Sequence, residues 1–332
     1  ADTVTRLPGD LLPWFEGWVG AALLAMVGLA IGLVIALRPG VRGAIPFARV
    51  IAEATVTIVV GGAAGTSATA AIAGPLTLPA DWSVVACDIG QGDAVLLRSA
   101  GSVALIDTGP EPAPLASCLS RVGVERIDLL VLTHFDLDHV GGAEAVRGRV
   151  GTVLHGPPAD VADERLLRDL ADGGARVVSA AEGLTGRLGD AQWRVLWPRG
   201  GSRAFPSGND ASIVVDVRGG GIPSMLLLGD LSASPQAALA ASALLAPPYA
   251  VVKVAHHGSA DQDAALYAAA DPSIALVTVG ADNDYGHPRD EILDIVSGLG
   301  ARVARTDTQG LVALSLRGDE VSVWRERVGG GD

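Results

Sequence analysis

The run Thr133-His134-Phe135-Asp136-Leu137-Asp138-His139 follows directly on Ile127–Leu132, which is apolar at every position but Asp128. An apolar run of this length is typical of a strand buried on both faces. The run after it carries four imidazole or carboxylate groups within six residues, His134 to His139. Such groups are costly at the end of a buried strand unless a cation lies between them. The stretch therefore predicts a metal site, with His134, Asp136 and Asp138 on one side of an extended chain.

Three later apolar strands end in residues of the same kind. Asp230 follows Leu226–Gly229, and His256 and His257 follow Val251–Ala255. His287 comes after Val277–Gly280 and a short loop. Strands that each deliver a ligand-type side chain at their end are expected to share one rim, where a metal site forms.

The pattern from residue 83 onward predicts a two-sheet α/β fold. Short β-rich runs are separated by glycine-containing turns, and helical patterns are interspersed among them. Two sheets with helices on the outside account for this order, which is an αββα sandwich. The expected helices are 113–122, 161–172, 235–245, 263–270 and 289–299; the expected strands include 83–89, 94–99, 102–108, 152–154, 193–196, 212–217, 223–229, 250–255, 274–279, 302–305, 311–316 and 321–324.

The first part of the chain has a different character. Residues 18–37 contain no charged side chain, a length that can cross a bilayer, and a second apolar stretch follows at about 45–73. We therefore expect a membrane region over 1–75, with helices at about 14–37 and 45–73, and a second domain over 76–332 that contains the metal site. Arg38, Arg42 and Arg49 lie between the two stretches, so the positive-inside rule places that loop in the cytoplasm and the later domain on the outer face. A buried soluble hairpin or a signal peptide is the alternative reading.

Charge and cysteine content add two constraints. The net charge of the chain is −13. Residues 1–80 hold four basic and four acidic side chains and sum to zero, so the excess lies in residues 81–332. An acidic domain does not attract nucleic acid over long range.

The two cysteines, Cys87 and Cys118, fit no disulfide framework or zinc-ligand spacing, and we expect two small buried side chains.

At this point the motifs resemble a known family. Asp107-Thr108-Gly109, the Thr133–His139 run, Gly229-Asp230 and a late histidine resemble the metallo-β-lactamase superfamily. Further features resemble more narrowly the C-terminal domain of the ComEC family of bacterial DNA-uptake proteins, over about residues 82–324. These are Asp88–Ala94, Gly208–Ser212, Lys253–Ser259 and Tyr285–Pro288.

The resemblance implies a ligand set and a choice of metal. His134, Asp136 and Asp210 would hold one ion, and Asp138, His139 and a late histidine the other, with Asp230 bridging. The late histidine is His256, His257 or His287. Two departures from the superfamily pattern stand out, since Asp136 replaces a histidine and Asn209-Asp210 lie where another is usual. Oxygen in place of nitrogen shifts the preference from zinc toward harder ions such as manganese or magnesium, and the remaining histidines make magnesium less suitable than manganese. The same departures leave open whether one or two ions bind.

Other residues receive supporting roles. Asp107 is expected to orient the metal loop through hydrogen bonds rather than to bind metal. Lys253, the only lysine in the chain, either meets a substrate phosphate or is a structural charge near the rim. Asp138 would also orient the attacking water. A histidine that is not needed as a ligand, with His257 as one candidate, would give a proton to the leaving oxygen.

These expectations lead to one function and two alternatives. The first is a membrane-anchored nuclease of a DNA-uptake channel, which hydrolyses DNA phosphodiesters with a metal-bound hydroxide. The second is a hydrolase of the same fold that acts on RNA or a small ester. The third is a non-catalytic domain that binds DNA or channel partners.

Overall fold

The computed structural model describes residues 28–29, 31, 50–51, 53–57, 78–201 and 203–327. The chain divides into two units, Ala1–Thr77 and Leu78–Asp332. The two stretches expected to span a membrane lie for the most part outside the described residues. Within those residues, no helix has the length and apolar character needed to cross a bilayer.

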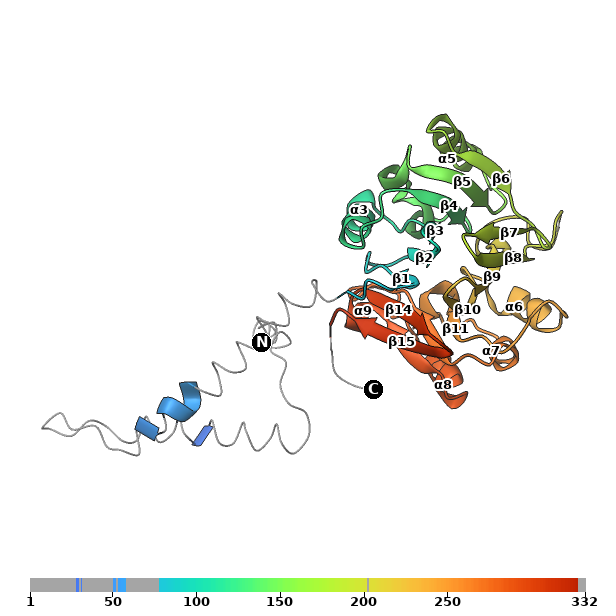
Figure 1. Cartoon of the computed structure of the whole chain (residues 1–332). Helices are drawn as coiled ribbons and strands as arrows, with labels where there is room; N and C mark the ends of the chain where they lie inside the picture. The colour runs from blue at the N-terminus through green and yellow to red at the C-terminus, as the bar shows by residue number, and fades with distance from the viewer. Residues whose placement is uncertain are drawn as a thin grey trace, which may run out of the picture. The chain divides into compact units, whose positions relative to one another are not determined.

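In the part of the chain that the structure describes, the second unit contains two sheets (Figure 1). The first has the strand order β15-β14-β1-β2-β3-β4-β5-β6 and the second β13-β12-β11-β10-β9-β8-β7. The strands of the first sheet are β1 (Val84–Ala86), β2 (Val95–Ser99), β3 (Ser102–Ile106), β4 (Ile127–Leu132), β5 (Val150–His155), β6 (Arg176–Ser179), β14 (Val312–Arg317) and β15 (Glu320–Arg325). Those of the second are β7 (Thr185–Leu188), β8 (Ala191–Trp197), β9 (Val214–Gly219), β10 (Ile222–Leu227), β11 (Val251–Lys253), β12 (Ile274–Val277) and β13 (Arg302–Arg305).

Helices lie on the outer faces of both sheets, as the αββα expectation requires (Figure 1). Leucines of α3 and α5 pack on the first sheet, and apolar side chains of α6, α7 and α8 pack on the second. The α-helices are α3 (Pro112–Arg121), α4 (Leu137–Val140), α5 (Val161–Asp172), α6 (Ala233–Ala240), α7 (Ala264–Ala270), α8 (Asp290–Gly298) and α9 (Thr306–Gln309).

Strand β4 shows why the fold needs apolar side chains on both faces. Leu129 and Val131 belong to the core between the sheets, together with Leu227 of the facing sheet. Leu130 and Leu132 point the other way, into the core beneath the outer helices. Alternation along a strand sends successive side chains to opposite faces, so the part of β4 that is covered on both sides, Leu129–Leu132, is apolar, whereas Asp128 near its start is exposed.

Parallel pairing brings the ends of distant strands together. Strands β3 to β6 run parallel in the first sheet, and β10 to β13 do so in the second. The residues that follow β4, β10 and β11 therefore emerge at the carboxyl edges of their sheets. Those residues include His134, Asp230 and His257.

Some expected elements differ in the structure. Strands β6 and β7 were not expected, and both are short and only partly buried, so their apolar pattern is weak. The helix expected over 235–245 ends at Ala240, where the Ser242 hydroxyl donates to the Leu239 carbonyl over 2.6 Å and closes the last turn.

The expectation of two separate cysteines is wrong, because Cys87 and Cys118 form a disulfide. Cys87 follows β1, and Cys118 lies on the buried face of α3, which packs on the same sheet. Their Cα atoms are 5.9 Å apart, within the range that a disulfide spans. The packing of the helix on the sheet creates this proximity, and the spacing of the cysteines in the sequence does not reveal it.

Candidate metal centre

Four ligand-type side chains converge at the facing strand ends. They are Asp138 and His139 from α4, Asp230 from the loop after β10, and His257 from the loop after β11. One ligand atom from each lies within 4.8 Å of the others, and we refer to them as the four-ligand cluster. The His257 Nε2 atom is 3.1 Å from Asp138 Oδ2 and 3.3 Å from Asp230 Oδ2, and His139 Nε2 is 3.2 Å from the same Asp230 oxygen.

Hydrogen bonds fix how the two imidazoles face the cluster. His139 Nδ1 lies 2.8 Å from Asp107 Oδ2, and His257 Nδ1 lies 2.9 Å from the carbonyl oxygen of Thr278. Both partners are acceptors, so each Nδ1 carries the hydrogen and each Nε2 is left to face the cluster. Asp107 itself accepts from the Thr133 amide and hydroxyl, each over 2.7 Å. The expected supporting place of Asp107 fits this arrangement, since carboxylates behind a ligand commonly orient it.

Three buried atoms at the site have no hydrogen-bond partner among the described residues. They are His134 Nε2, His139 Nε2 and Asp230 Oδ1. Buried polar groups are nearly always hydrogen-bonded in folded proteins, so atoms of this kind gathered in one place call for a ligand. Imidazole nitrogen and carboxylate oxygen are suitable donors for a divalent transition metal. The residues present therefore fit a metal ion.

The cluster is strongly polarised even without a cation. Burial alone would raise the pKa of Asp230, but the imidazoles of His139 and His257 outweigh it and hold that pKa well below its usual value. Burial would likewise lower the pKa of His139 and of His257, but neighbouring carboxylates, Asp230 first, raise both well above the usual range. Positive charge is thus strongly favoured among these side chains, and a bound cation would supply it in place of protons.

His134 and Asp136 lie beside the four-ligand cluster and not within it. The His134 ring centroid is 4.1 Å from that of His139, and its Nε2 is 3.7 Å from Asp136 Oδ2. Its Nδ1 lies 3.2 Å from Thr133 Oγ1 and 3.3 Å from Ser212 Oγ. The expectation that His134, Asp136 and Asp138 share one side of an extended chain is wrong. Helix α4 begins at Leu137, which ends the alternation and turns Asp138 and His139 together toward Asp230.

The backbone separates the two adjacent histidines of the late motif. His256 and His257 both have positive φ, 48° and 52°, which is uncommon for residues other than glycine. His257 is buried in the cluster, whereas the His256 side chain is 35% exposed and its Nε2 is 3.9 Å from Asp230 Oδ2. His287 lies farther out, with its ring against that of His256 at 5.8 Å. Among the three histidines left open by the sequence, the structure brings His257 into the cluster.

Asn209 and Asp210 begin a short 3₁₀ helix, Asn209–Ala211. The Asp210 carbonyl accepts from Trp197 Nε1 over 2.8 Å, and its carboxylate accepts from the Ser232 amide over 3.4 Å. Asp210 is therefore bonded to the loop after Asp230, and the structure does not bring it into the four-ligand cluster.

Lys253 and Asp93 form a buried ion pair beneath the cluster, each about 2% exposed. The Lys253 ammonium also lies 3.8 Å from Asp230 Oδ1 and donates to the Gly229 carbonyl over 3.4 Å. Asp93 Oδ1 is 3.2 Å from His257 Nδ1. Of the two readings left open for Lys253, a structural charge fits this buried position. Asp93 was missed because Gly90–Asp93 looks like an ordinary hairpin turn, although the only lysine in the chain, if buried, needs a carboxylate partner.

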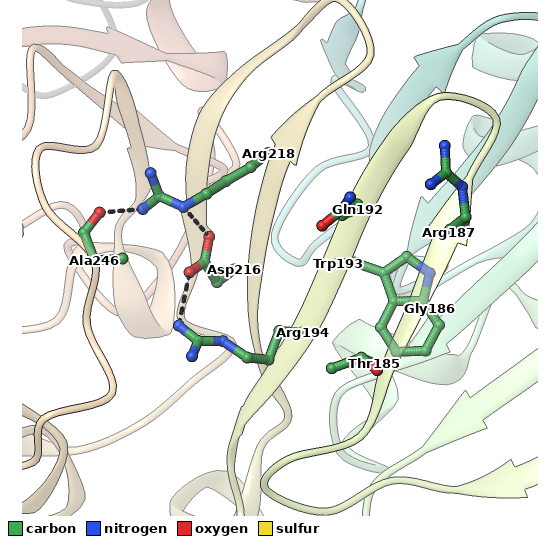
Figure 2. Close-up of a pocket in the computed structure, with 9 residues that line it drawn as sticks. All are labelled: Thr185, Gly186, Arg187, Gln192, Trp193, Arg194, Asp216, Arg218 and Ala246. Atoms are coloured by element: carbon green, nitrogen blue, oxygen red, sulfur yellow. Dashed lines mark hydrogen bonds and ion pairs between the residues drawn. The ribbon is translucent and has the colours of Figure 1, made fainter.

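A cavity of about 450 Å³ lies elsewhere, on the second sheet (Figure 2). It is lined by side chains of β7, β8 and β9 and contains no member of the four-ligand cluster. Asp216 holds two guanidinium groups there, with Arg194 Nη2 at 3.2 Å and Arg218 Nε at 2.8 Å (Figure 2). The described residues that line this cavity include no histidine and no carboxylate other than Asp216, which the two arginines hold, so we place the chemistry at the four-ligand cluster.

Comparison with known proteins agrees with this fold. Residues 87–280 match the model of the metallo-beta-lactamase superfamily, and the chain belongs to that superfamily. Two curated relatives are ComE operon protein 3 of Bacillus subtilis (strain 168) and Competence protein ComA of Neisseria gonorrhoeae. The first is 29% identical over 261 residues, which are 71% of this chain and 33% of that protein. The second is 29% identical over 259 residues, which are 74% of this chain and 34% of that protein.

The resemblance to the ComEC family is confirmed by these relatives. The chain spans about a third of their length. A solved structure with a similar fold is CmlA, a diiron beta-hydroxylase from Streptomyces venezuelae. Its TM-score is 0.50 at 20% sequence identity, over 72% of this chain and 55% of that one, and this likeness concerns the fold alone.

Proposed function

We propose that the chain is a metal-dependent phosphodiesterase that cuts DNA as part of a DNA-uptake apparatus. The observation that carries the proposal is the four-ligand cluster of Asp138, His139, Asp230 and His257, in which His139 Nε2 and Asp230 Oδ1 have no hydrogen-bond partner among the described residues. The competence proteins among the relatives support DNA as the substrate and the rest of an uptake channel as the partner.

The four-ligand cluster would hold one divalent ion. His134 and Asp136, which lie next to it, would contribute to a second. A bound ion would supply a Lewis acid for the phosphate and lower the pKa of a water to near neutrality. Two imidazoles with two carboxylates make a mixed nitrogen and oxygen set, which suits manganese, with zinc as the second choice and magnesium the least favoured.

Asp138 is the residue of the cluster best placed to act on water. Its side chain is 33% exposed, whereas those of His139, Asp230 and His257 are buried. Burial would raise the pKa of Asp138, but the hydrogen bond from His257 and the neighbouring imidazoles outweigh it, so the pKa is lowered and the carboxylate is ionised. Oδ2 faces His257 Nε2 at 3.1 Å. Such a carboxylate can orient a water molecule by accepting a hydrogen bond from it.

We also propose that the domain lies on the outer face of a cytoplasmic membrane. The arginines at 38, 42 and 49 between the two apolar stretches support this orientation. The Cys87–Cys118 disulfide adds independent support, because disulfides persist in oxidising compartments and are rare in the cytosol.

A cleavage assay of the full chain tests the proposal. End-labelled single-stranded and duplex DNA are incubated with manganese, zinc or magnesium, and a matched RNA strand and a small ester are assayed in parallel. We expect DNA cleavage that is fastest with manganese, is abolished in Asp230→Asn, and is unchanged in Asp172→Asn, an exposed carboxylate on α5. Faster cleavage of the RNA strand or of the ester than of DNA would show that DNA is not the preferred substrate. Survival of all substrates in a metal-loaded chain would favour a binding domain.

A further inference from the structure

Six aromatic rings form a continuous row from the metal centre to the protein surface. The row begins with His134, His139 and His257, whose neighbouring centroids are 4.1 Å and 5.2 Å apart. It continues through His256, at 6.1 Å from His257, and reaches His287 at a further 5.8 Å. The last ring is that of Tyr285, which is stacked on His287 at 5.6 Å with an interplanar angle of 27°.

Exposure increases along the row. His257 is buried, His256 is about one-third exposed, and Tyr285 is 62% exposed. Tyr285 is therefore an aromatic ring at the outer end of a row that starts in the four-ligand cluster, with one neighbour, His287, stacked on it and more than half of its surface open to solvent. We call Tyr285 and His287 the ring platform.

The loop that carries the ring platform is held in place by its own hydrogen bonds. Asn283 Nδ2 donates to the carbonyls of Gly280 and His287 over 2.7 Å and 2.9 Å, and its Oδ1 accepts from the His287 amide over 2.9 Å. Arg289 Nη2 donates to the Tyr285 carbonyl over 2.5 Å. A platform fixed in this way loses little conformational entropy when a ligand binds.

The charge of the surroundings limits what such a platform can attract. The loop carries Asp282, Asp284 and Asp290 against Arg289, and the net charge of the chain is −13. A phosphate backbone gains nothing from this field at long range. Stacking of a nucleobase on an aromatic ring does not depend on positive charge, because every base has a flat face.

We propose that the ring platform is a subsite for a nucleobase of a DNA strand, which stacks on Tyr285 while the metal centre acts on a neighbouring phosphodiester. This inference rests on the proposed function and adds the feature by which the enzyme distinguishes single-stranded from duplex DNA. The bases inside a duplex already stack on one another, so only an unpaired or terminal base can reach the platform. The enzyme therefore favours single strands and strand ends.

The test compares an intact single strand with a matched strand that has an abasic site beside the cleaved linkage, using the full chain with manganese. Tyr285→Ala raises KM for the intact strand about tenfold, in line with the loss of one base stack, and Tyr285→Phe retains the wild-type KM. On the abasic strand, wild type and Tyr285→Ala have equal KM, since no base is there to stack. The control is Leu299→Ala, 38% exposed just after the other end of α8, which matches wild type on both strands.

A binding measurement separates this inference from the proposed function. A strand that contains 2-aminopurine is titrated with metal-free wild type and Tyr285→Ala, and quenching by wild type alone supports the platform. If the chain cuts no substrate and this difference persists, the nuclease proposal fails and the platform stands. Equal quenching by the two proteins, or an equal KM increase on intact and abasic strands, overturns the platform whatever the cleavage result.

Discussion

The Asp107 carboxylate and the His139 imidazole form a fully buried pair, with Asp107 Oδ2 2.8 Å from His139 Nδ1. The same carboxylate accepts two hydrogen bonds from Thr133, at the end of β4. Asp107 thus connects the end of the central strand to a residue of the four-ligand cluster, and it holds the imidazole with Nε2 toward Asp230.

Asp107→Asn should weaken metal binding by about 10- to 100-fold, because an amide cannot accept hydrogen bonds on both sides as the carboxylate does. Competition with a chromogenic chelator measures the affinity. Asp128→Asn is the matched control, since Asp128 also lies at the β3–β4 border and accepts from the Val103 amide over 2.8 Å, but at the start of β4. Equal affinities in wild type and Asp107→Asn would show that the pair has no part in metal binding.

Lys253→Met should lower the free energy of unfolding by about 3–5 kcal/mol, because it leaves the Asp93 carboxylate buried without its ammonium partner. The double variant Lys253→Met/Asp93→Asn should recover part of this loss, since it removes both charges. Urea unfolding followed by circular dichroism gives all the values. If the two side chains were not coupled, the losses in free energy of unfolding of the two single variants would simply add in the double variant. That result would contradict the prediction.

Loss of the disulfide should destabilise the second unit. Cys87 and Cys118 are 31 residues apart in the sequence, and closing a loop of that length is worth about 3–4 kcal/mol in the chain-entropy model. The double variant Cys87→Ser/Cys118→Ser should therefore unfold at a lower urea concentration than the oxidised wild type. A reductant should shift wild type toward the variant and leave the variant unchanged, and coincident curves for oxidised wild type and variant would contradict the linkage.

The orientation proposal predicts that the domain can be reached from outside the cytoplasmic membrane. A single new cysteine at the exposed Asp172, in the Cys87→Ser/Cys118→Ser background, should react with an impermeant thiol reagent in intact cells. Labelling that requires permeabilised cells would place the domain in the cytoplasm and refute the proposal.

Much of the site could be predicted because the end of a buried strand is visible in the sequence, as the point where an apolar run stops. Apolar runs that stop at His134, at Asp230 and before His256 predicted a shared rim, and the two-sheet fold brings those ends together. The choice of His257 over His256 could not be predicted, since it depends on two consecutive residues with positive φ. Nothing local marks Asp93 either, because its partner Lys253 lies in the other sheet.

The disulfide and the start of α4 were missed for a related reason. Cys87 and Cys118 meet only because α3 packs on the sheet that contains β1. The turn of Asp138 away from the extended direction begins at Leu137, directly after the N-cap Asp136, and an aspartate, although disfavoured in strands, does not by itself fix where a helix begins. Both features are consequences of tertiary packing, which a pattern of residue types does not record.

The metal content of the purified full chain tests the central claim most directly. Elemental analysis after dialysis should find manganese or zinc in the wild type and in the control Asp172→Asn. Asp138→Ala should lose most of that metal, because it removes one of the four ligands that lie within 4.8 Å of one another. The same metal content in Asp138→Ala as in wild type, with both proteins folded by circular dichroism, would contradict the account.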